Sequence, residues 1–365
     1  MTNVLGYLCS SVSWGGLEMN QMKNALWMKE RGHEVYVICK LDSPIFKACT
    51  DAKIPIIEIG NHKKYYDFKS GNALAHRLDE HQITHLIVRD TRDMSVAVIA
   101  KRKSKHPIHL SYFNEMQFGV KKTNLLHSIR FSYFDLWSSP LNWLAKQVET
   151  MTHLNKKKIC VIPSGLDLRV FENELSRTEA RELLQLPKDK IIFGLIGRFD
   201  PDKGQVLLLE ALSKINNPNV CVCLLGEPTI GEGNNYSELM NATIEKNKLS
   251  DRVFIRPFMK DIKPFFNAIN AFVMASKAET FGMVTIESMA CGTPVIASNA
   301  GGSPEILDLG KFGLLFTPID PSSLAEKMIH FIDFPTEFSS EKLKEEAKKY
   351  DHMKVCELVE DKLSL

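Results

Sequence analysis

Residues 4–39 read VLGYLCSSVSWGGLEMNQMKNALWMKERGHEVYVIC. The apolar run at residues 4–9 predicts a buried strand, and a loop of small residues leads into a helical pattern over residues 17–31. Gly32 ends that pattern, and residues 34–39 form a second apolar run. Two parallel strands need a long crossover between them, which is usually a helix. The stretch therefore predicts a strand–helix–strand unit that opens a parallel sheet.

The same alternation continues outward from this unit. In the first half of the chain we expect strands at 54–59, 85–88, 108–113 and 159–163, and helices at 70–81 and 94–103. The alternation restarts after a charged stretch, with strands expected at 191–196, 220–225, 253–255, 272–274 and 294–298, and helices at 205–215, 236–247 and 283–289. Uniformly apolar strands indicate sheets that are covered by helices on both faces.

A chain of 365 residues is longer than one hydrophobic core usually serves, and about 150 residues per domain predicts two domains. We expect an α/β fold with two Rossmann-like, doubly wound domains, at residues 1–165 and 166–340, facing each other across a cleft. Sheets of this kind bind ligands beyond the carboxyl ends of their strands. The loops that follow the strands are therefore the candidate binding segments.

The composition is that of an ordinary globular protein, with 44% hydrophobic and 25% charged residues. The N-terminus shows no basic segment before a long apolar run, and no stretch reaches the ~18 apolar residues of a membrane-spanning helix. The eight cysteines are scattered and form no Cys-x-x-Cys pair, which favours buried reduced thiols over disulfides or a metal site. We therefore expect a cytoplasmic protein.

The charge is unevenly divided along the chain. Residues 1–160 contain 23 Lys and Arg against 14 Asp and Glu, whereas residues 161–365 contain 23 against 30. A basic half joined to an acidic half suggests that only the first half faces an anionic partner, such as a membrane surface or a phosphate-bearing acceptor. Nucleic acid is not expected as a partner, because the basic residues show no recognition-helix or aromatic-interleaved pattern.

A loop with two cations follows the strand expected at 191–196. Residues 197–204 read GRFDPDKG, and Gly204 opens the next helix. Arg198 and Lys203 would lie beside backbone amides at a helix N-terminus, which is a suitable place for a diphosphate. A solvated turn with ordinary charges is the alternative.

The same loop has the letters of a metal-binding Asp-x-Asp motif in Asp200-Pro-Asp202. Acidic residues are common in turns for conformational reasons, however. Arg198 and Lys203 could neutralise a diphosphate between them. We therefore expect neither a metal nor a cofactor.

A second loop carries two glutamates. Residues 276–288 read SKAETFGMVTIES, with Glu279 in the loop and Glu287 about one and a half turns into the helix after Gly282. Ionised carboxylates accept hydrogen bonds from vicinal hydroxyls, so one glutamate suits a sugar and the other a ribose. The amides after Gly282 would face the phosphates. An ordinary solvated helix residue is the alternative reading of Glu287.

Two glycine pairs complete the candidate segments. Gly301-Gly302 follows the strand expected at 294–298, and Gly15-Gly16 follows the first strand of the chain. Glycine lets the backbone approach a ligand closely, although a tight structural turn needs the same residue. We expect the amides near Gly15-Gly16 to meet the phosphate or the sugar.

At these residues the chain resembles the retaining GT-B glycosyltransferases of family four, the glycosyl transferases group 1. The likeness covers nearly the whole chain and is strongest over residues 163–310. The matching motifs are Pro163-Ser-Gly165-Leu-Asp167, Gly197-Arg198 with Lys203-Gly204, Gly226-Glu227, Glu279 and Glu287 around Phe281-Gly282, and Gly301-Gly302 with Glu305. The resemblance implies that the helix expected at 341–365 packs back on the first domain.

The resemblance also implies roles for the candidate residues. Arg198 and Lys203 would hold the donor diphosphate, Glu279 would lie against the donor sugar, and Glu287 would bind the ribose. The implied donor-binding residues are Gly15, Gly16, Arg198, Lys203, Gly226, Pro257, Phe258, Glu279, Phe281, Gly282, Met283, Val284 and Glu287. Catalysis in the family is metal-independent and retains the anomeric configuration, and the two cations would stabilise charge as it develops on the leaving diphosphate.

The first domain departs from the family pattern. Many members carry a histidine after a middle strand, near the reacting centre, whereas residues 111–119 read SYFNEMQFG here. Either Asn114 or Glu115 takes that catalytic place, or both are surface polar residues. The basic segments at 101–105 and 121–122 either touch lipid headgroups or an anionic acceptor, or are solvated helix ends.

The sequence thus predicts a retaining, hexosyltransferase-type enzyme that moves a sugar from a nucleotide diphosphate sugar, with UDP favoured, to a glycan or lipid-linked acceptor. Sequences of this type often serve cell-surface polysaccharide or lipopolysaccharide biosynthesis, peripherally on the inner face of the membrane. A nucleotide-sugar epimerase on the same fold and a non-catalytic protein that binds a sugar nucleotide or glycan are the alternatives. A dinucleotide dehydrogenase is not expected, because no Gly-x-Gly-x-x-Gly follows the first strand.

Overall fold

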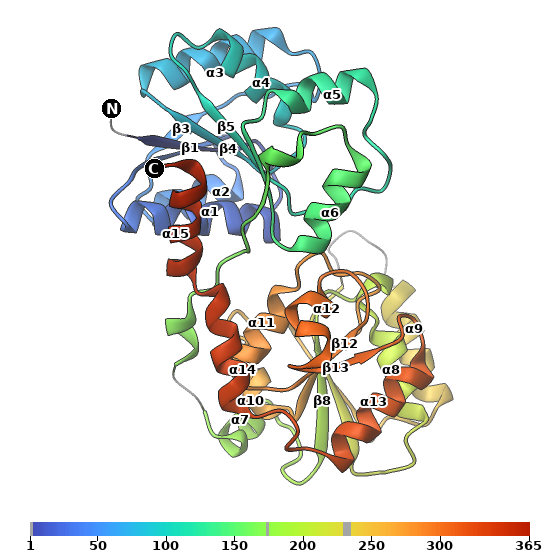
Figure 1. Cartoon of the computed structure of the whole chain (residues 1–365). Helices are drawn as coiled ribbons and strands as arrows, with labels where there is room; N and C mark the ends of the chain where they lie inside the picture. Colours follow the sequence, from blue (N-terminus) through green and yellow to red (C-terminus); the bar gives the residue numbers. More distant parts are fainter. Residues whose placement is uncertain (1–2, 173–174, 229–234) are drawn as a thin grey trace. The chain divides into compact units, whose positions relative to one another are not determined.

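The computed structural model describes residues 3–172, 175–228 and 235–365. The chain forms two compact units (Figure 1). The first comprises Met1–Gly165 together with His352–Leu365, and the second comprises Leu166–Asp351. Each unit is an α/β structure with its own parallel sheet.

The first unit holds a seven-stranded sheet in the order β3-β2-β1-β4-β5-β6-β7. Its strands are β1 (Val4–Cys9), β2 (Glu34–Cys39), β3 (Ile56–Glu58), β4 (His85–Val88), β5 (His109–Phe113), β6 (Leu136–Ser139) and β7 (Ile159–Val161). The paired strands are parallel, and β1 lies between β2 and β4 with Leu5 opposite both Val35 and His85. The order reverses between β1 and β4, which makes this pair the topological switch point of the sheet.

Helices cover both faces of this sheet. They are α1 (Gly16–Glu30), α2 (Pro44–Asp51), α3 (Phe68–Glu80), α4 (Met94–Lys103), α5 (Leu125–Ser132), α6 (Asn142–Met151) and α15 (His352–Leu363). One core joins the sheet to α3, α4, α5 and α6, and a second core joins it to α1, α2 and α15 (Figure 1). Burial on both faces explains why the strands are apolar throughout.

The second unit holds a six-stranded parallel sheet in the order β10-β9-β8-β11-β12-β13. Its strands are β8 (Ile191–Ile196), β9 (Val220–Leu225), β10 (Val253–Arg256), β11 (Ala271–Met274), β12 (Val295–Ser298) and β13 (Leu314–Phe316). Here the order reverses between β8 and β11, which pair through Ala271 opposite Phe193.

The helices of the second unit again lie on two sides. They are α7 (Arg177–Leu183), α8 (Gln205–Ser213), α9 (Asn235–Lys246), α10 (Lys263–Ala268), α11 (Met283–Ala290), α12 (Ser303–Ile306), α13 (Pro321–Asp333) and α14 (Ser340–Ala347). A buried core joins α8, α9 and α13 to the sheet. On the other side α10 packs so close to β8 that a Cβ on Gly194 would lie 2.7 Å from the Phe265 ring.

The end of the chain is divided between the units, whereas the sequence suggested one helix over residues 341–365. Helix α14 contacts α11 in the second unit. Helix α15 belongs to the first unit, where the Arg31 guanidinium donates to Glu360 over 2.7 and 2.8 Å. The break falls at Lys348–Asp351, where a short 3-10 turn separates the helices and Asp351 is extended.

The predicted α/β fold with two doubly wound sheets is confirmed. Among the described residues, two strands, β6 and β13, were not predicted. The eight cysteines are free thiols, as the composition indicated, and seven of them are buried. Within the described part of the chain, no helix is long and apolar enough to cross a membrane.

Candidate functional site

The switch point of the second sheet brings together the cation loop and the first glutamate. The cation loop, residues 197–204, follows β8, and the glutamate loop, residues 275–282, follows β11. Lys203 Nζ donates a hydrogen bond to Glu279 Oε2 over 3.0 Å, and their side chains are 32% and 22% exposed. An ammonium has three donors. The pair is thus accessible, and Lys203 retains donor capacity for a further oxygen ligand.

Short hydrogen bonds fix the cation loop. Asp200 accepts from the amide of Asp202 over 2.8 Å and so caps the short 3-10 turn Pro201–Lys203. The Gln205 side chain donates to the carbonyl of Arg198 over 2.7 Å. Arg198 itself is exposed. The Asp200 carboxylate therefore acts as a turn-capping group, which is the conformational role expected of an acidic residue there.

The backbone of Glu279 is held by the glycine pair after β12. The amide of Gly302 donates to the carbonyl of Glu279 over 2.8 Å. Gly301 has φ +62, and a Cβ on it would lie 2.1 Å from the same carbonyl oxygen. Only glycine fits this position, because a side chain would be both strained and overlapping. The geometry thus gives Gly301-Gly302 a structural role, since the pair positions the backbone of Glu279.

Helix α11 begins directly after the glutamate loop. Gly282 caps it with φ +86, and Met283 and Val284 form its first turn. The first amides of a helix lack partners within the helix and carry its positive dipole end, which favours phosphate. Phe281 is 7% exposed and packs edge-on against Tyr350, with the ring centroids 5.7 Å apart. Glu287 is half-buried one turn further along α11.

The remaining predicted residues of the second unit follow β9 and β10. The amide of Gly226 donates to the Arg256 carbonyl over 3.0 Å. A Cβ on Gly226 would lie 2.0 Å from the carbonyl oxygen of Gly197, so this glycine allows two strand ends to approach. Pro257 is exposed, and Phe258 is 70% exposed. Such an exposed ring offers a flat apolar surface.

Gly15 and Gly16 lie at the start of α1 in the first unit. Gly15 is the N-cap, and its amide donates to the Glu18 carboxylate over 2.9 Å. A Cβ on Gly16 would have no atom within 4 Å. The backbone geometry therefore does not demand glycine at position 16.

Asn114 and Glu115, predicted either as catalytic or as surface polar residues, are buried and half-buried, respectively. Asn114 is 3% exposed, and its Nδ2 has no hydrogen-bond partner among the described residues. Glu115 forms an ion pair with Arg89 and accepts from Asn20 over 3.2 Å. Burial raises the pKa of Glu115 despite the nearby guanidinium. A small cavity of about 20 Å³ lies beside them, enough for about one water molecule.

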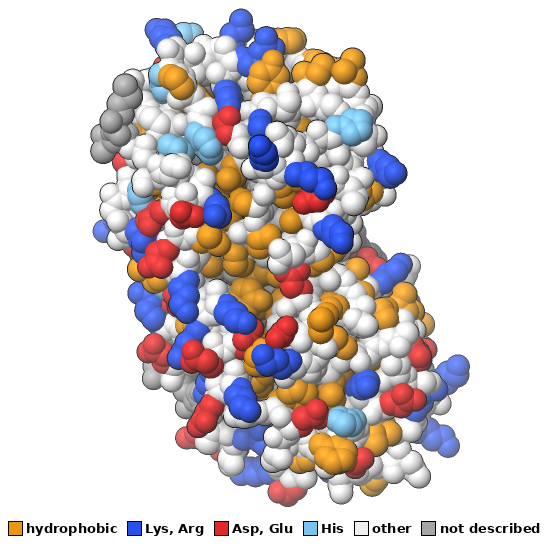
Figure 2. Space-filling model, viewed as in Figure 1, with side chains coloured by type: hydrophobic (Ala, Val, Ile, Leu, Met, Phe, Trp, Pro, Cys, Tyr) orange, Lys and Arg blue, Asp and Glu red, His pale blue; other side chains and the backbone are white. Residues whose placement is uncertain are grey.

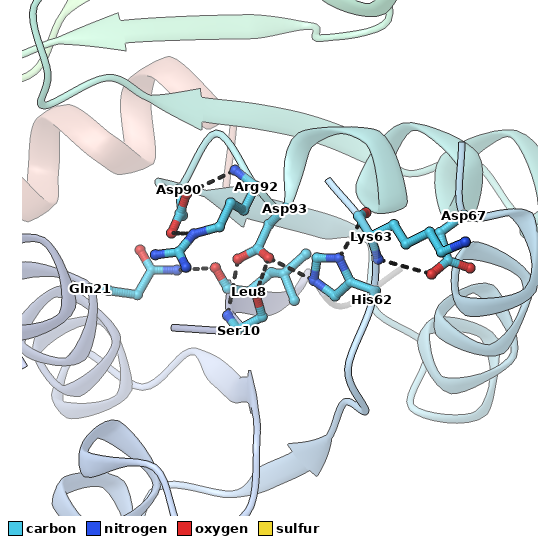
Figure 3. Close-up of polar contacts among 9 residues, drawn as sticks. All are labelled: Leu8, Ser10, Gln21, His62, Lys63, Asp67, Asp90, Arg92 and Asp93. Atoms are coloured by element: carbon cyan, nitrogen blue, oxygen red, sulfur yellow. Dashed lines mark hydrogen bonds and ion pairs between the residues drawn. The ribbon is translucent and has the colours of Figure 1, made fainter. Parts of the chain in front are cut away.

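Sequence reasoning missed a buried polar cluster at the switch point of the first sheet (Figure 3). His62 Nε2 lies 2.9 Å from Asp93 Oδ1, and these side chains are 2% and 0% exposed. The amide of Ser10 donates to the other Asp93 oxygen over 3.0 Å, and its hydroxyl donates to Oδ1. The hydrogen bond with Asp93 raises the pKa of His62. Ser10, His62 and Asp93 follow β1, β3 and β4, respectively. Their positions after strands of the sheet were the sequence signal that could have identified the cluster.

The second unit matches a known sequence family. Residues 176–350 match the family described as Glycosyl transferases group 1. The D-inositol 3-phosphate glycosyltransferase of Mycolicibacterium smegmatis is 32% identical over 191 residues, covering 52% of this chain and 43% of that protein. The protein of the same name from Streptomyces avermitilis is 32% identical over 186 residues, covering 49% and 40%. The matches thus span less than half the length of these curated relatives.

Solved structures resemble the whole chain. Anabaena Alr3699/HepE in complex with UDP has a TM-score of 0.86 at 21% identity, with 100% of both chains covered. The glycosyltransferase from Rickettsia africae ESF-5 has a TM-score of 0.87 at 18% identity, with 99% of both chains covered. At such identities the likeness establishes a shared fold.

Proposed function

Because residues 176–350 match the glycosyl transferases group 1 family in a chain with the GT-B fold, we propose that this protein transfers a sugar from a nucleotide diphosphate sugar to an acceptor. The observation that carries the proposal is the contact of Lys203 with Glu279 at the switch point of the second sheet. A cation for phosphate and a carboxylate for hydroxyls then lie side by side, close to the start of a helix.

The charged candidate residues of the second unit have distinct roles in this proposal. Arg198 and Lys203 bind the diphosphate and stabilise the charge that develops on it as the sugar leaves. Glu279 accepts hydrogen bonds from the sugar hydroxyls, and Glu287 accepts from the ribose. The first amides of α11 face a phosphate. We propose that these cations make a divalent metal unnecessary and that the anomeric configuration is retained.

We propose UDP as the nucleotide and a phosphate-bearing or lipid-linked molecule as the acceptor. Support for UDP comes from the Anabaena protein, whose structure contains it. Support for a phosphate-bearing acceptor comes from the names of the two bacterial relatives and from the excess of cations in residues 1–160. A glycan acceptor in polysaccharide or lipopolysaccharide biosynthesis, and a cytoplasmic location with peripheral contact to the membrane, belong to the same proposal.

A panel of UDP-, GDP- and ADP-sugars tests the donor. We expect one of them to raise the melting temperature and to release its nucleoside diphosphate, faster when a phosphorylated polyol such as inositol 3-phosphate is added. The proposal fails if no sugar nucleotide stabilises the protein. Conversion of the sugar without release of diphosphate would instead identify an epimerase, and stabilisation without turnover would identify a binding protein.

A further inference from the structure

The first unit contains a groove between α4, α5 and the segment at residues 61–67. It encloses about 410 Å³, within the range of about 300–1,000 Å³ that is typical of small-molecule sites. Its apolar wall is formed by Tyr65 and Tyr66 of the segment, Val98 and Ile99 of α4, and Leu126 and Ile129 of α5. Figure 2 shows hydrophobic and Lys or Arg side chains mingled on the upper part of this unit, where Figure 1 places α3, α4 and α5.

A buried cation lines this groove. Arg130 is 9% exposed. Its Nη1 donates to the Ser95 hydroxyl over 3.3 Å and its Nη2 to His127 Nδ1 over 2.9 Å. Its Nε has no hydrogen-bond partner among the described residues. The Tyr65 ring lies over the guanidinium, at 5.1 Å from Cζ.

These partners are neutral, so the charge of Arg130 is not balanced within the groove. His127 accepts the bond on Nδ1, which therefore carries no proton in this contact, and burial lowers the pKa of the imidazole. None of the described residues lining the groove is Asp or Glu, and Arg102 adds a second cation. The aromatic ring offsets part of the desolvation cost. Buried charges are nevertheless usually paired, and the groove therefore lacks a counter-anion.

The segment that forms one side of the groove is held in place. At the start of the segment the His62 imidazole contacts the Asp93 carboxylate (Figure 3). At its end the Asp67 carboxylate accepts a hydrogen bond from the Lys63 amide over 3.0 Å. Between them Tyr66 has φ +54, a conformation that bulky residues rarely adopt, and its side chain is 62% exposed. Tyr66 therefore presents an exposed aromatic ring beside the groove from a strained backbone position, and such positions occur at ligand-binding sites among others.

We propose that this groove binds a single-chain lipid phosphate, with its anion at Arg130 and its chain along Val98, Ile99 and Ile129. The chemistry follows from the combination of one unbalanced cation with apolar walls and no carboxylate. The inference rests on the first unit alone and does not depend on the proposed sugar transfer. A lipid-linked acceptor for that transfer would be one molecule of this class.

Isothermal titration of the full chain with alkyl phosphates below their micellar concentrations tests this site, with no sugar nucleotide present. Octyl, decyl and dodecyl phosphate should bind with rising affinity, about four-fold for each CH₂ group that enters the groove. Inorganic phosphate and dodecyl maltoside should each bind at least ten-fold more weakly than dodecyl phosphate. Equal binding of either control, or binding only to vesicles of anionic phospholipid, would overturn the proposal.

Two neighbouring residues on α5 provide a matched pair of variants. Leu126 lines the groove and is 61% exposed, whereas Leu125 does not line it and is 73% exposed. Leu126→Trp should fill the groove and weaken dodecyl phosphate binding at least ten-fold, whereas Leu125→Trp should leave it unchanged. Arg130→Gln should remove the preference for the phosphate head, which we expect to be about ten- to hundred-fold. If Leu126→Trp binds dodecyl phosphate as tightly as the unaltered chain, the ligand does not occupy this groove. This result would overturn the proposal whether or not Arg130→Gln folds.

Discussion

Lys203 and Glu279 are 76 positions apart in the chain, and their side chains meet over 3.0 Å. Lys203 lies in the loop after β8 and Glu279 in the loop after β11, and these two strands are neighbours at the point where the strand order reverses. The contact follows from the topology, because parallel neighbours at a switch point send their following loops to the same edge in opposite directions.

Replacing either partner should reduce sugar transfer without unfolding the second unit. Lys203→Ala removes a cation from the developing charge on the diphosphate, and we expect turnover to fall by about 10²–10³-fold. A partly exposed ion pair contributes only about 0–1 kcal/mol to stability. Steady-state kinetics with the accepted donor, beside urea unfolding, measure both effects. Lys277→Ala, an exposed lysine in the glutamate loop, is the control and should retain activity.

Gly301→Ala should weaken donor binding, whereas Gly310→Ala should leave donor binding unchanged. Both glycines have positive φ, of +62 and +106, so alanine strains both by about 1–2 kcal/mol. Only at Gly301 does the new Cβ meet backbone, at 2.1 Å from the Glu279 carbonyl oxygen. Donor affinity measured by titration should fall for Gly301→Ala alone. Equal losses in the two variants would show that Gly301 does not position Glu279.

The His62–Asp93 pair should make the first unit more stable at acidic than at alkaline pH. The pKa of His62 is raised in the folded state. The His62–Asp93 pair therefore contributes fully to the free energy of unfolding below the unfolded pKa of about 6.5. This contribution is lost as the pH rises through the higher folded value. The stability difference between the unaltered chain and His62→Gln should therefore shrink from pH 6 to pH 9. A difference that is independent of pH would contradict this account.

The Arg31–Glu360 ion pair should hold α15 on the first unit at neutral pH. The hydrogen bonds from Arg31 lower the pKa of Glu360 to about 2. The ion pair therefore adds to the free energy of unfolding above the unfolded pKa of about 4.3, and this stabilisation is lost as the pH falls to about 2. We expect Glu360→Gln to cost of order 2 kcal/mol, less than the full shift implies, because the side chains are 20% and 23% exposed.

Hydrogen exchange of the α15 amides measures this effect directly. Glu360→Gln should speed their exchange at pH 7, whereas Glu357→Gln, an exposed residue of the same helix, should have little effect. Unchanged exchange in Glu360→Gln would mean that apolar packing alone holds the helix.

Most of the fold could be predicted because its strands are apolar and well spaced. Strand β6 was not predicted because its sequence is Leu-Trp-Ser-Ser, and serines in a sequence are typical of loops. Ser138 and Ser139 are 2% and 0% exposed, between β5 and β7. Strand β13 has only three residues, too few for a periodic pattern.

The sequence could predict which loops form the candidate site, but not which of their side chains are in contact. The loops after β8 and β11 pointed to Arg198, Lys203 and Glu279 as candidates, whereas the contact between Lys203 and Glu279 depends on the strand order. The ion pair of Glu115 with Arg89 and that of His62 with Asp93 join residues 26 and 31 positions apart. The positions of these residues after strands mark them as candidates, whereas which residues pair depends on the strand order of the sheet.

The most direct test of the central claim is a crystal structure of the protein with its accepted donor bound. We predict diphosphate oxygens within about 3 Å of Lys203 Nζ and sugar hydroxyls at a similar distance from Glu279. A well-ordered donor that contacts neither side chain would contradict the account.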